Sequence, residues 1–78
     1  MADRLQVLIA GCLDVDPAEI SNDTGTHNLA KWDSLRHMRI VFALEEDFNV
    51  RFRDQELMSL TSVSAIRDAL RERNIATD

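Results

Sequence analysis

Apolar residues recur at helical spacing through residues 34–49, and they fall on two sides of the predicted helix instead of one. The broader stripe consists of Ile40, Val41, Leu44 and Phe48. The narrower stripe consists of Leu35, Met38 and Phe42, flanked by Arg39 and Glu46. Because a helix in a small bundle cannot easily bury both sides, we expect the broader stripe to face a core and the narrower stripe to lie at or near the surface.

The narrower stripe has two interpretations. An exposed apolar stripe is typical of a docking surface for another protein. A neighbouring helix or a loop that covers the stripe would produce the same pattern. The spacing alone favours neither interpretation.

The segment before this helix and the segment after it also predict helices. Residues 3–13 place Leu5, Leu8, Ile9, Cys12 and Leu13 on one helical face. Asp3 is the expected N-cap of this helix, and Asp16-Pro17 is expected to stop it. Residues 54–60 predict a short helix with Asp54 as its N-cap.

A last helix is expected after Thr61 or Ser62 as N-cap, and it carries apolar residues on one face at Val63, Ile66, Ala69 and Leu70. We expect residues 74–78 to fray. The fold class is therefore predicted to be all-α, a small four-helix bundle of three longer helices and one short helix. A chain of this length predicts a single domain over residues 1–78.

Residues 17–33 form a long connection between the first two predicted helices. They lack a sustained period and are rich in Ser, Asn, Asp, Thr and Gly. Loops of this length are usually either disordered or functional. Ile20, Leu29 and Trp32 can fasten this one to the bundle, so we expect a long ordered loop.

Composition excludes several classes of function. The formal net charge is -5, and no basic stripe accumulates that could neutralise phosphates, so we expect no nucleic acid partner. No apolar run approaches the length of a membrane span. Cys12 is the one cysteine, which rules out a disulfide within the chain, and its place on an apolar face favours a buried structural thiol. The first residues lack the apolar run of a secretory signal, so we expect a cytoplasmic protein. We also expect the protein to be a monomer.

Asp33 and Ser34 stand where the long loop ends and the two-sided helix begins. Both residue types are preferred N-caps, and capping alone would explain the pair. A cap needs only one of them, however. The other can project from the first turn, where free N–H groups and the positive end of the helix dipole favour a phosphate.

Ser34, His37 and Asp33 are also the residue types of a nucleophile, a base and an orienting acid. Within one helical turn they cannot align the orienting acid behind the base, and no glycine-rich turn supplies an oxyanion hole, so we expect no catalytic residue. His37 falls on the core-facing side and is expected to be a partly buried packing residue. Cys12, His27 and His37 lack the paired spacing of a zinc site, so no metal site is expected.

Several of these motifs together resemble the acyl carrier protein family. They are Asp33-Ser34-Leu35 at the start of a helix, the A-L-E-E-D-F of residues 43–48, and the T-S-V-S-A-I of residues 61–66 before the last helix. Asp33-Ser34-Leu35 alone would be weak evidence for the family, because these are three common residues. Their order within a short acidic helical chain makes the resemblance specific, and it covers nearly the whole chain.

The resemblance implies that Ser34 is the attachment point of a covalent 4'-phosphopantetheine arm. A separate phosphopantetheinyl transferase would transfer the arm from coenzyme A with magnesium, and Asp33 would support the placement of that metal. The thiol of the arm would hold an acyl group as a thioester, so the chain would be a carrier and not an enzyme. The expected partners are acyl-activating, synthase or acyltransferase enzymes. The residues expected to bind them are Leu35, Arg36, Met38, Arg39 and Phe42.

The chain departs from many fatty-acid carriers of this family. Arg36 and Arg39 add positive charge at the start of the helix, which disfavours a partner with a uniformly basic docking patch. Trp32 and the His37-Met38 that follows are more similar to stand-alone carriers of specialised biosynthetic clusters, which favours a polyketide-like or other dedicated pathway over housekeeping fatty-acid synthesis. Two alternatives are a peptidyl or aminoacyl carrier, which shares the arm, and an unmodified helical interaction module.

Overall fold

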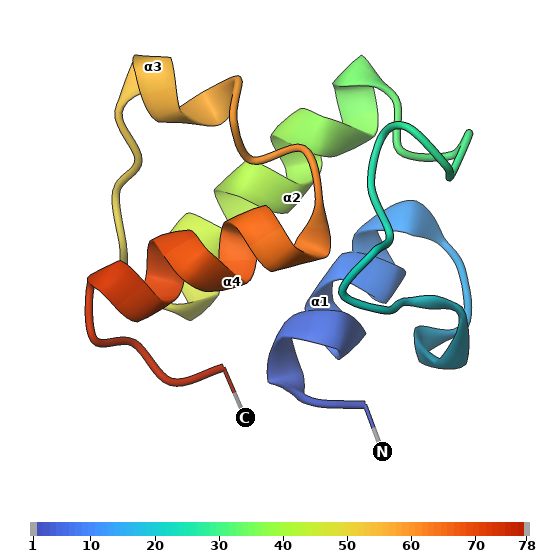
Figure 1. Ribbon diagram of the computed structural model, residues 1–78, viewed down its shortest axis with the longest axis horizontal. Helices are drawn as coiled ribbons and strands as arrows, with labels where there is room; N and C mark the ends of the chain where they lie inside the picture. The colour runs from blue at the N-terminus through green and yellow to red at the C-terminus, as the bar shows by residue number, and fades with distance from the viewer. Residues whose placement is uncertain (1, 78) are drawn as a thin grey trace.

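The computed structural model describes residues 2–77. This part of the chain contains α1 (Arg4–Leu13), α2 (Ser34–Asp47), α3 (Asp54–Leu57), α4 (Val63–Glu72) and a single 3-10 turn, η1 (Pro17–Glu19). In Figure 1, α1 and α3 lie on opposite sides of the pair formed by α2 and α4. The predicted all-α fold with three longer helices and one short helix is confirmed.

The helix α1 begins at Arg4 because Asp3 provides a complete N-cap. The Asp3 carboxylate accepts a hydrogen bond from the Gln6 N–H at 2.9 Å, and the Gln6 side-chain oxygen accepts one from the Asp3 N–H at 3.0 Å. The predicted cap is confirmed. Burial acts to raise the pKa of Asp3, but hydrogen bonds from Arg67 and the Gln6 N–H outweigh it and hold that pKa below its ordinary value.

The prediction that Asp16-Pro17 stops α1 is wrong. α1 already ends at Leu13, where Asp14 adopts a left-handed conformation with φ of 59°. Such a residue closes a helix end by redirecting the chain. Asp16 acts as the cap of η1, since its side chain accepts from the Ala18 N–H at 2.9 Å.

The long loop is ordered, as predicted, because its apolar residues enter the core. Ile20 and Trp32 are each only 2% exposed, and Leu29 is partly buried against the same core. Backbone hydrogen bonds also tie the loop to the start of α4. The Thr26 N–H donates to the Thr61 carbonyl at 2.9 Å, and the Val63 N–H donates to the Thr24 carbonyl at 2.9 Å.

Gly25 permits this close approach between the loop and the segment before α4. A Cβ atom at position 25 would lie 2.5 Å from the Thr61 carbonyl oxygen, a distance that real contacts do not allow. Any larger residue at this position would therefore push the loop away from α4. The loop in turn carries the chain to Asp33 and the start of α2.

The broader stripe of α2 forms the centre of the core, as predicted. Ile40 and Leu44 are completely buried, and Val41 and Phe48 are buried with them. From the other helices, the fully buried residues that meet them are Leu5, Ile9, Leu13, Val63, Ile66 and Leu70. Ala69, which was expected in the core, is only partly buried at its edge.

The cap predicted for α3 is wrong. Asp54 is the first residue inside α3, and Arg53 is the N-cap residue, with extended backbone angles. The Arg53 N–H donates to the Glu56 side chain at 2.9 Å. A carboxylate three residues into the helix therefore satisfies the exposed N–H, so Asp54 is not needed as a cap.

The predicted fraying at the end of the chain is wrong for residues 74–77, and residue 78 lies outside the described residues. Asn74 adopts a left-handed conformation with φ of 59°, which turns the chain back after α4. The Ile75 N–H then donates to the Leu70 carbonyl at 3.0 Å, and Ile75 packs against the core. The two ends of the described chain meet where the Leu5 N–H donates to the Thr77 carbonyl at 3.2 Å (Figure 1).

An ion pair between α3 and α4 predicts a dependence of stability on pH. Both carboxylate oxygens of Glu56 accept from Arg73 at 2.7 Å, and this hydrogen bonding holds the pKa of Glu56 below its ordinary value. A lowered folded-state pKa adds stability above the ordinary carboxyl range, and that stability is lost as the pH falls through the folded-state pKa. We expect Glu56→Gln to weaken the protein at neutral pH and to lose less stability than the wild type on acidification.

Urea denaturation at neutral pH and at a pH well below the ordinary pKa of Glu56, 4.5, measures this difference. Glu46→Gln provides the control, because Glu46 is exposed and forms no ion pair within residues 2–77. A Glu56→Gln protein that loses as much stability on acidification as the wild type would contradict this account.

Candidate functional site

Ser34 is the first residue of α2, and Asp33 is the N-cap. The Asp33 carboxylate accepts from the Arg36 N–H at 2.9 Å, so the cap is provided by Asp33 alone. Ser34 is exposed, and its hydroxyl forms no hydrogen bond within the described part of the chain. The prediction that one residue of the pair caps the helix and the other projects outward agrees with this arrangement.

Arg36 returns to the same cap. Its guanidinium lies 3.2 Å from the second carboxylate oxygen of Asp33, and both side chains are substantially exposed. An ion pair this open to water adds little stability. The pair does join both carboxylate oxygens of Asp33 to Arg36, and the carboxylate partly compensates the charge of Arg36 at the start of α2.

A largely apolar depression of about 450 Å³ opens beside Ser34. Its lining consists of Thr26, Trp32, Asp33, Ser34, His37, Leu57, Met58 and Thr61. The loop, the first turn of α2 and the end of α3 therefore contribute to one hollow. Met58 forms its most exposed part, with 83% of its surface open to solvent.

His37 is partly buried, as predicted, but its role is more specific than packing. Its Nδ1 accepts from the Trp32 indole N–H at 3.0 Å, and its Nε2 lies 2.9 Å from the Leu57 carbonyl oxygen. Both ring nitrogens are therefore engaged away from Ser34. While these bonds persist, the imidazole cannot act as a base toward the Ser34 hydroxyl, which argues against a catalytic Asp33-Ser34-His37 unit.

The narrower stripe of α2 is exposed at two of its three positions. Leu35 and Phe42 are 68% and 62% exposed, whereas Met38 is half-buried. At 100° per residue Met38 is the one of the three nearest to the core-facing direction, which explains its partial burial. The interpretation that a neighbour covers the whole stripe is wrong for Leu35 and Phe42.

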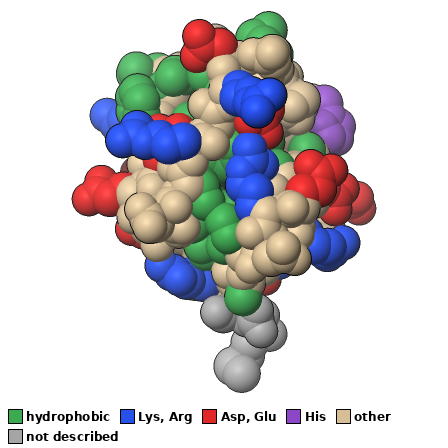
Figure 2. Space-filling model, turned by 90° about the vertical axis from the view of Figure 1, so that its left-hand side faces the viewer, with side chains coloured by type: hydrophobic (Ala, Val, Ile, Leu, Met, Phe, Trp, Pro, Cys, Tyr) green, Lys and Arg blue, Asp and Glu red, His purple; other side chains and the backbone are tan. Residues whose placement is uncertain are grey.

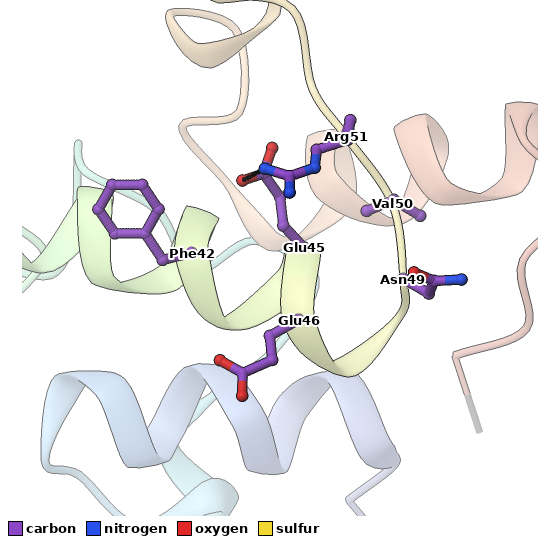
Figure 3. A pocket seen from close by; sticks show the side chains of 6 residues that line it. All are labelled: Phe42, Glu45, Glu46, Asn49, Val50 and Arg51. Carbon is purple, nitrogen blue, oxygen red and sulfur yellow. Dashed lines mark ion pairs between the residues drawn. The ribbon is translucent and has the colours of Figure 1, made fainter.

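Further along α2, a second, more polar depression of about 520 Å³ adjoins Phe42. Its lining consists of Phe42, Glu45, Glu46, Asn49, Val50 and Arg51. Figure 3 shows Glu45 reaching toward Arg51, with which it forms an ion pair at 3.8 Å, while Phe42 projects away from that pair and Glu46 extends toward α1. The outer face of α2 thus changes from basic residues near Ser34 to acidic residues at its far end.

Charges elsewhere on the surface are mixed. On the face shown in Figure 2, acidic and basic side chains are interspersed around a band of apolar side chains, without a continuous basic area. Cys12 is partly buried, less than its place on the apolar face predicted, and burial raises the pKa of its thiol, with the charge of Arg39 acting in the opposite direction. A raised pKa disfavours the reactive thiolate.

Within residues 2–77, no group of three His, Cys, Asp or Glu side chains is arranged to hold a metal ion. No helix in this part of the chain has the length and apolar character needed to cross a membrane.

Comparison with known protein families shows to which family the chain belongs. Residues 3–70 match the family model described as a phosphopantetheine attachment site. The chain belongs to that family. Its members carry 4'-phosphopantetheine covalently, and the function of this chain is accordingly that of an acyl carrier protein.

Individual carrier proteins support the assignment. The chain is 34% identical over 68 residues to the polyketide-8 synthase acyl carrier protein 2 of Streptomyces avermitilis, a match that covers 87% of this chain and 78% of that protein. It is 30% identical over 69 residues to an acyl carrier protein of Buchnera aphidicola, with 88% of each covered. The solution structure of a holo acyl carrier protein from Geobacter metallireducens superposes with a TM-score of 0.78 at 26% identity, covering 90% of this chain and 80% of that one.

Proposed function

We propose that this acyl carrier protein bears its 4'-phosphopantetheine arm on Ser34. The proposal depends mainly on one observation at the start of α2. Asp33 caps the helix, and the Ser34 hydroxyl is therefore left exposed and without a hydrogen-bond partner within residues 2–77. A hydroxyl in this position is open to the active site of a separate transferase. No other role in the structure competes for it.

The residues around Ser34 fit the phosphate of such an arm. The Asp33 carboxylate and carbonyl accept from the N–H groups of Arg36 and His37, at 2.9 Å and 2.8 Å. The N–H groups of Ser34 and Leu35 are left for a phosphate at the positive end of the helix dipole. Asp33 is half exposed beside the hydroxyl, where it can assist the magnesium-dependent transferase.

The arm supplies a terminal thiol that holds an acyl group as a thioester. The chain itself supplies position: an exposed attachment point, a rigid helix that begins there, and a face for partner enzymes. We propose that it has no catalytic activity of its own, in line with the engagement of both His37 nitrogens away from Ser34.

Intact mass spectrometry tests the attachment. Incubation of the purified protein with coenzyme A, magnesium and a broad-specificity phosphopantetheinyl transferase is expected to add the mass of one arm per chain. A protein whose mass stays unchanged, under conditions that fully modify another carrier, would contradict the proposal.

We propose that partner enzymes dock on the outer face of α2, formed by Leu35, Arg36, Met38, Arg39 and Phe42. The exposure of Leu35 and Phe42 supports this face, because large apolar side chains that lie open to water on the same side of one helix are typical of an interaction surface. Acyl-activating enzymes, synthases and acyltransferases are the proposed partners, together with the transferase.

The two arginines of this face are expected to act unequally. Arg36 is paired with Asp33, whereas Arg39 is exposed and has no ion pair within residues 2–77. Arg39→Glu should therefore raise the association rate with a partner that has a basic docking patch by about tenfold at low salt, and Arg36→Glu should raise it less. Stopped-flow association rates at low and high salt measure this, and equal rates for the wild type and Arg39→Glu at low salt would contradict it.

We propose a polyketide-like or other dedicated biosynthetic pathway as the setting. The Streptomyces avermitilis relative, a polyketide synthase carrier, and the basic residues near Ser34 support this proposal. Loading assays that compare acyl-activating with amino-acid-activating enzymes test the cargo, and exclusive loading of amino acids would overturn it. A single domain over residues 1–78, a monomeric state and a cytoplasmic location stay predictions from the sequence.

A further inference from the structure

One imidazole connects three separate segments next to the proposed attachment point. The indole N–H of Trp32 is a donor only, so the Nδ1 atom of His37, 3.0 Å away, must accept from it. The Leu57 carbonyl oxygen is an acceptor only, so the Nε2 atom of His37, 2.9 Å away, must donate to it. The two neighbours together require the neutral imidazole with its proton on Nε2. We refer to Trp32, His37 and Leu57 as the imidazole bridge.

The bridge joins the end of the long loop, the first turns of α2 and the last residue of α3. Trp32 is a rigid anchor, since it is only 2% exposed, and its ring stacks near His37 with centroids 6.2 Å apart. α3, by contrast, has only four residues, too few for a helix to be stable by itself. It must be held by its surroundings.

Two polar contacts hold α3, one on each side. Glu56 binds Arg73, the C-cap residue of α4, through both carboxylate oxygens, and the Leu57 carbonyl accepts from His37 of α2. The side chain of Leu57 is only partly buried, and the following Met58 is almost fully exposed. The attachment of α3 to α2 therefore depends strongly on His37.

The bridge also forms a wall of the depression beside Ser34. Ser34 and His37 are three residues apart on α2 and so lie on neighbouring positions of its surface. Ser34, His37, Leu57 and Met58 all line the same hollow of about 450 Å³. Because Ser34 is itself a lining residue, a group attached to its hydroxyl would start at this hollow.

We propose that His37 is a positioning residue for the arm. This role of His37 rests on the proposed function, in which Ser34 carries 4'-phosphopantetheine. By fixing both Leu57 of α3 and Trp32 of the loop to α2, the neutral imidazole keeps the end of α3 beside the attachment point, so that the side of the hollow that the arm contacts keeps its shape. Without the bridge, α3 moves away and the arm loses that wall.

The geometry of the bridge requires that Nδ1 of His37 carry no proton. A proton on Nδ1 would face the indole N–H, and two donors cannot bond to each other. The contact with Trp32 would then be lost, while the contact with Leu57 would remain. Asp33, which is paired with Arg36, is the other ionisable side chain that lines the hollow, and the lining residues from the loop, from α3 and from the segment before α4 are uncharged.

Matched variants separate the two halves of the bridge. In His37→Asn the amide oxygen can take the place of Nδ1 and keep Trp32, but Leu57 loses its donor. In His37→Gln the longer side chain can reach Leu57, but Trp32 loses its acceptor. His37→Phe removes both contacts. Trp32→Phe removes only the indole donor and leaves the imidazole in place.

Two measurements on the unmodified protein test whether the two contacts of His37, with Trp32 and with Leu57, are formed. The NMR resonance of the Trp32 indole N–H is expected to shift in His37→Gln and His37→Phe and to stay near its wild-type position in His37→Asn. Amide exchange at Ser59, whose N–H bonds the Glu56 carbonyl, is expected to rise about tenfold in His37→Asn and His37→Phe but not in His37→Gln. In Trp32→Phe the Leu57 carbonyl still requires a donor, so ¹⁵N shifts of the His37 ring should still show the Nε2–H tautomer.

The arm-bearing protein then tests the positioning role. Nuclear Overhauser contacts from the arm to Leu57 and Met58 are expected in the wild type and in His37→Gln, and are expected to weaken severalfold in His37→Asn and His37→Phe. Unchanged arm contacts in all four variants would overturn the role of His37 while leaving attachment to Ser34 intact. If all His37 variants matched the wild type in both measurements on the unmodified protein, the bridge itself would be refuted, whether or not Ser34 carries an arm.

Discussion

Replacement of Ser34 by alanine is expected to abolish the addition of the phosphopantetheine arm completely. The hydroxyl oxygen is the atom that forms the new bond to phosphorus, and alanine has nothing in its place. The fold should survive the change, because the N-cap of α2 is provided by Asp33, whose carboxylate accepts from the Arg36 N–H at 2.9 Å. Intact mass after treatment with coenzyme A, magnesium and a transferase should show no gain, and the thermal unfolding midpoint should stay close to that of the wild type.

Ser64 provides a matched control for this experiment. It is also an exposed serine in the first turn of a helix, where Ser62 provides the cap by accepting from the Ala65 N–H at 3.2 Å. Ser64→Ala should be modified as fully as the wild type. An equal gain in mass for Ser34→Ala and the wild type would mean that the arm is attached elsewhere. The exposed hydroxyl that Asp33 leaves free at Ser34 would then not be the attachment point.

The features that depend on local geometry were predictable from the sequence. The two stripes of α2 follow from rotation of 100° per residue, which assigns Leu44 to the core and Leu35 to the surface before any contact is known. Asp3 acts as an N-cap as expected, and Ser62 is the N-cap of α4 among the two residues expected there, because the bonds that define a cap lie within a few residues of it. The same reasoning predicted that one of Asp33 and Ser34 caps α2 and that the other projects, but it did not say which.

Two other kinds of feature were not predictable in this way: the choice between competing local caps, and contacts between distant segments. Asp54 loses the role of cap because the Glu56 side chain reaches back to Arg53, a local competition that the pattern did not resolve. His37 meets Leu57, which lies 20 residues further along the chain, and no periodicity links the two. The one available signal was a tryptophan five residues before a histidine across a helix start, where a lone indole donor needs an acceptor once it is buried.

The order of the chain end was missed for a similar reason. Asn74 follows α4 with polar neighbours, so the composition of residues 74–78 favoured fraying. The structure returns this segment to the core through Ile75 and to α1 through the bond from the Leu5 N–H to the Thr77 carbonyl. These contacts exist only once α1 and α4 have packed, so they are a consequence of the tertiary fold and not of local preference.

The assignment of the two sides of α2 is tested by one substitution made on each side. Leu44 is completely buried and Leu35 is 68% exposed, although both are leucines on the same helix. Leu44→Ala is expected to lower the free energy of unfolding by about 2–5 kcal/mol, because it removes buried methyl groups and leaves a cavity. That is a large part of the roughly 5–15 kcal/mol that stabilises a small domain. Leu35→Ala should change it by less than about 0.5 kcal/mol, since it creates no cavity. Urea denaturation measures both. A larger loss for Leu35→Ala than for Leu44→Ala would show that the inner and outer faces of α2 had been exchanged, and equal losses would contradict the assignment of the two faces on which the proposed docking role depends.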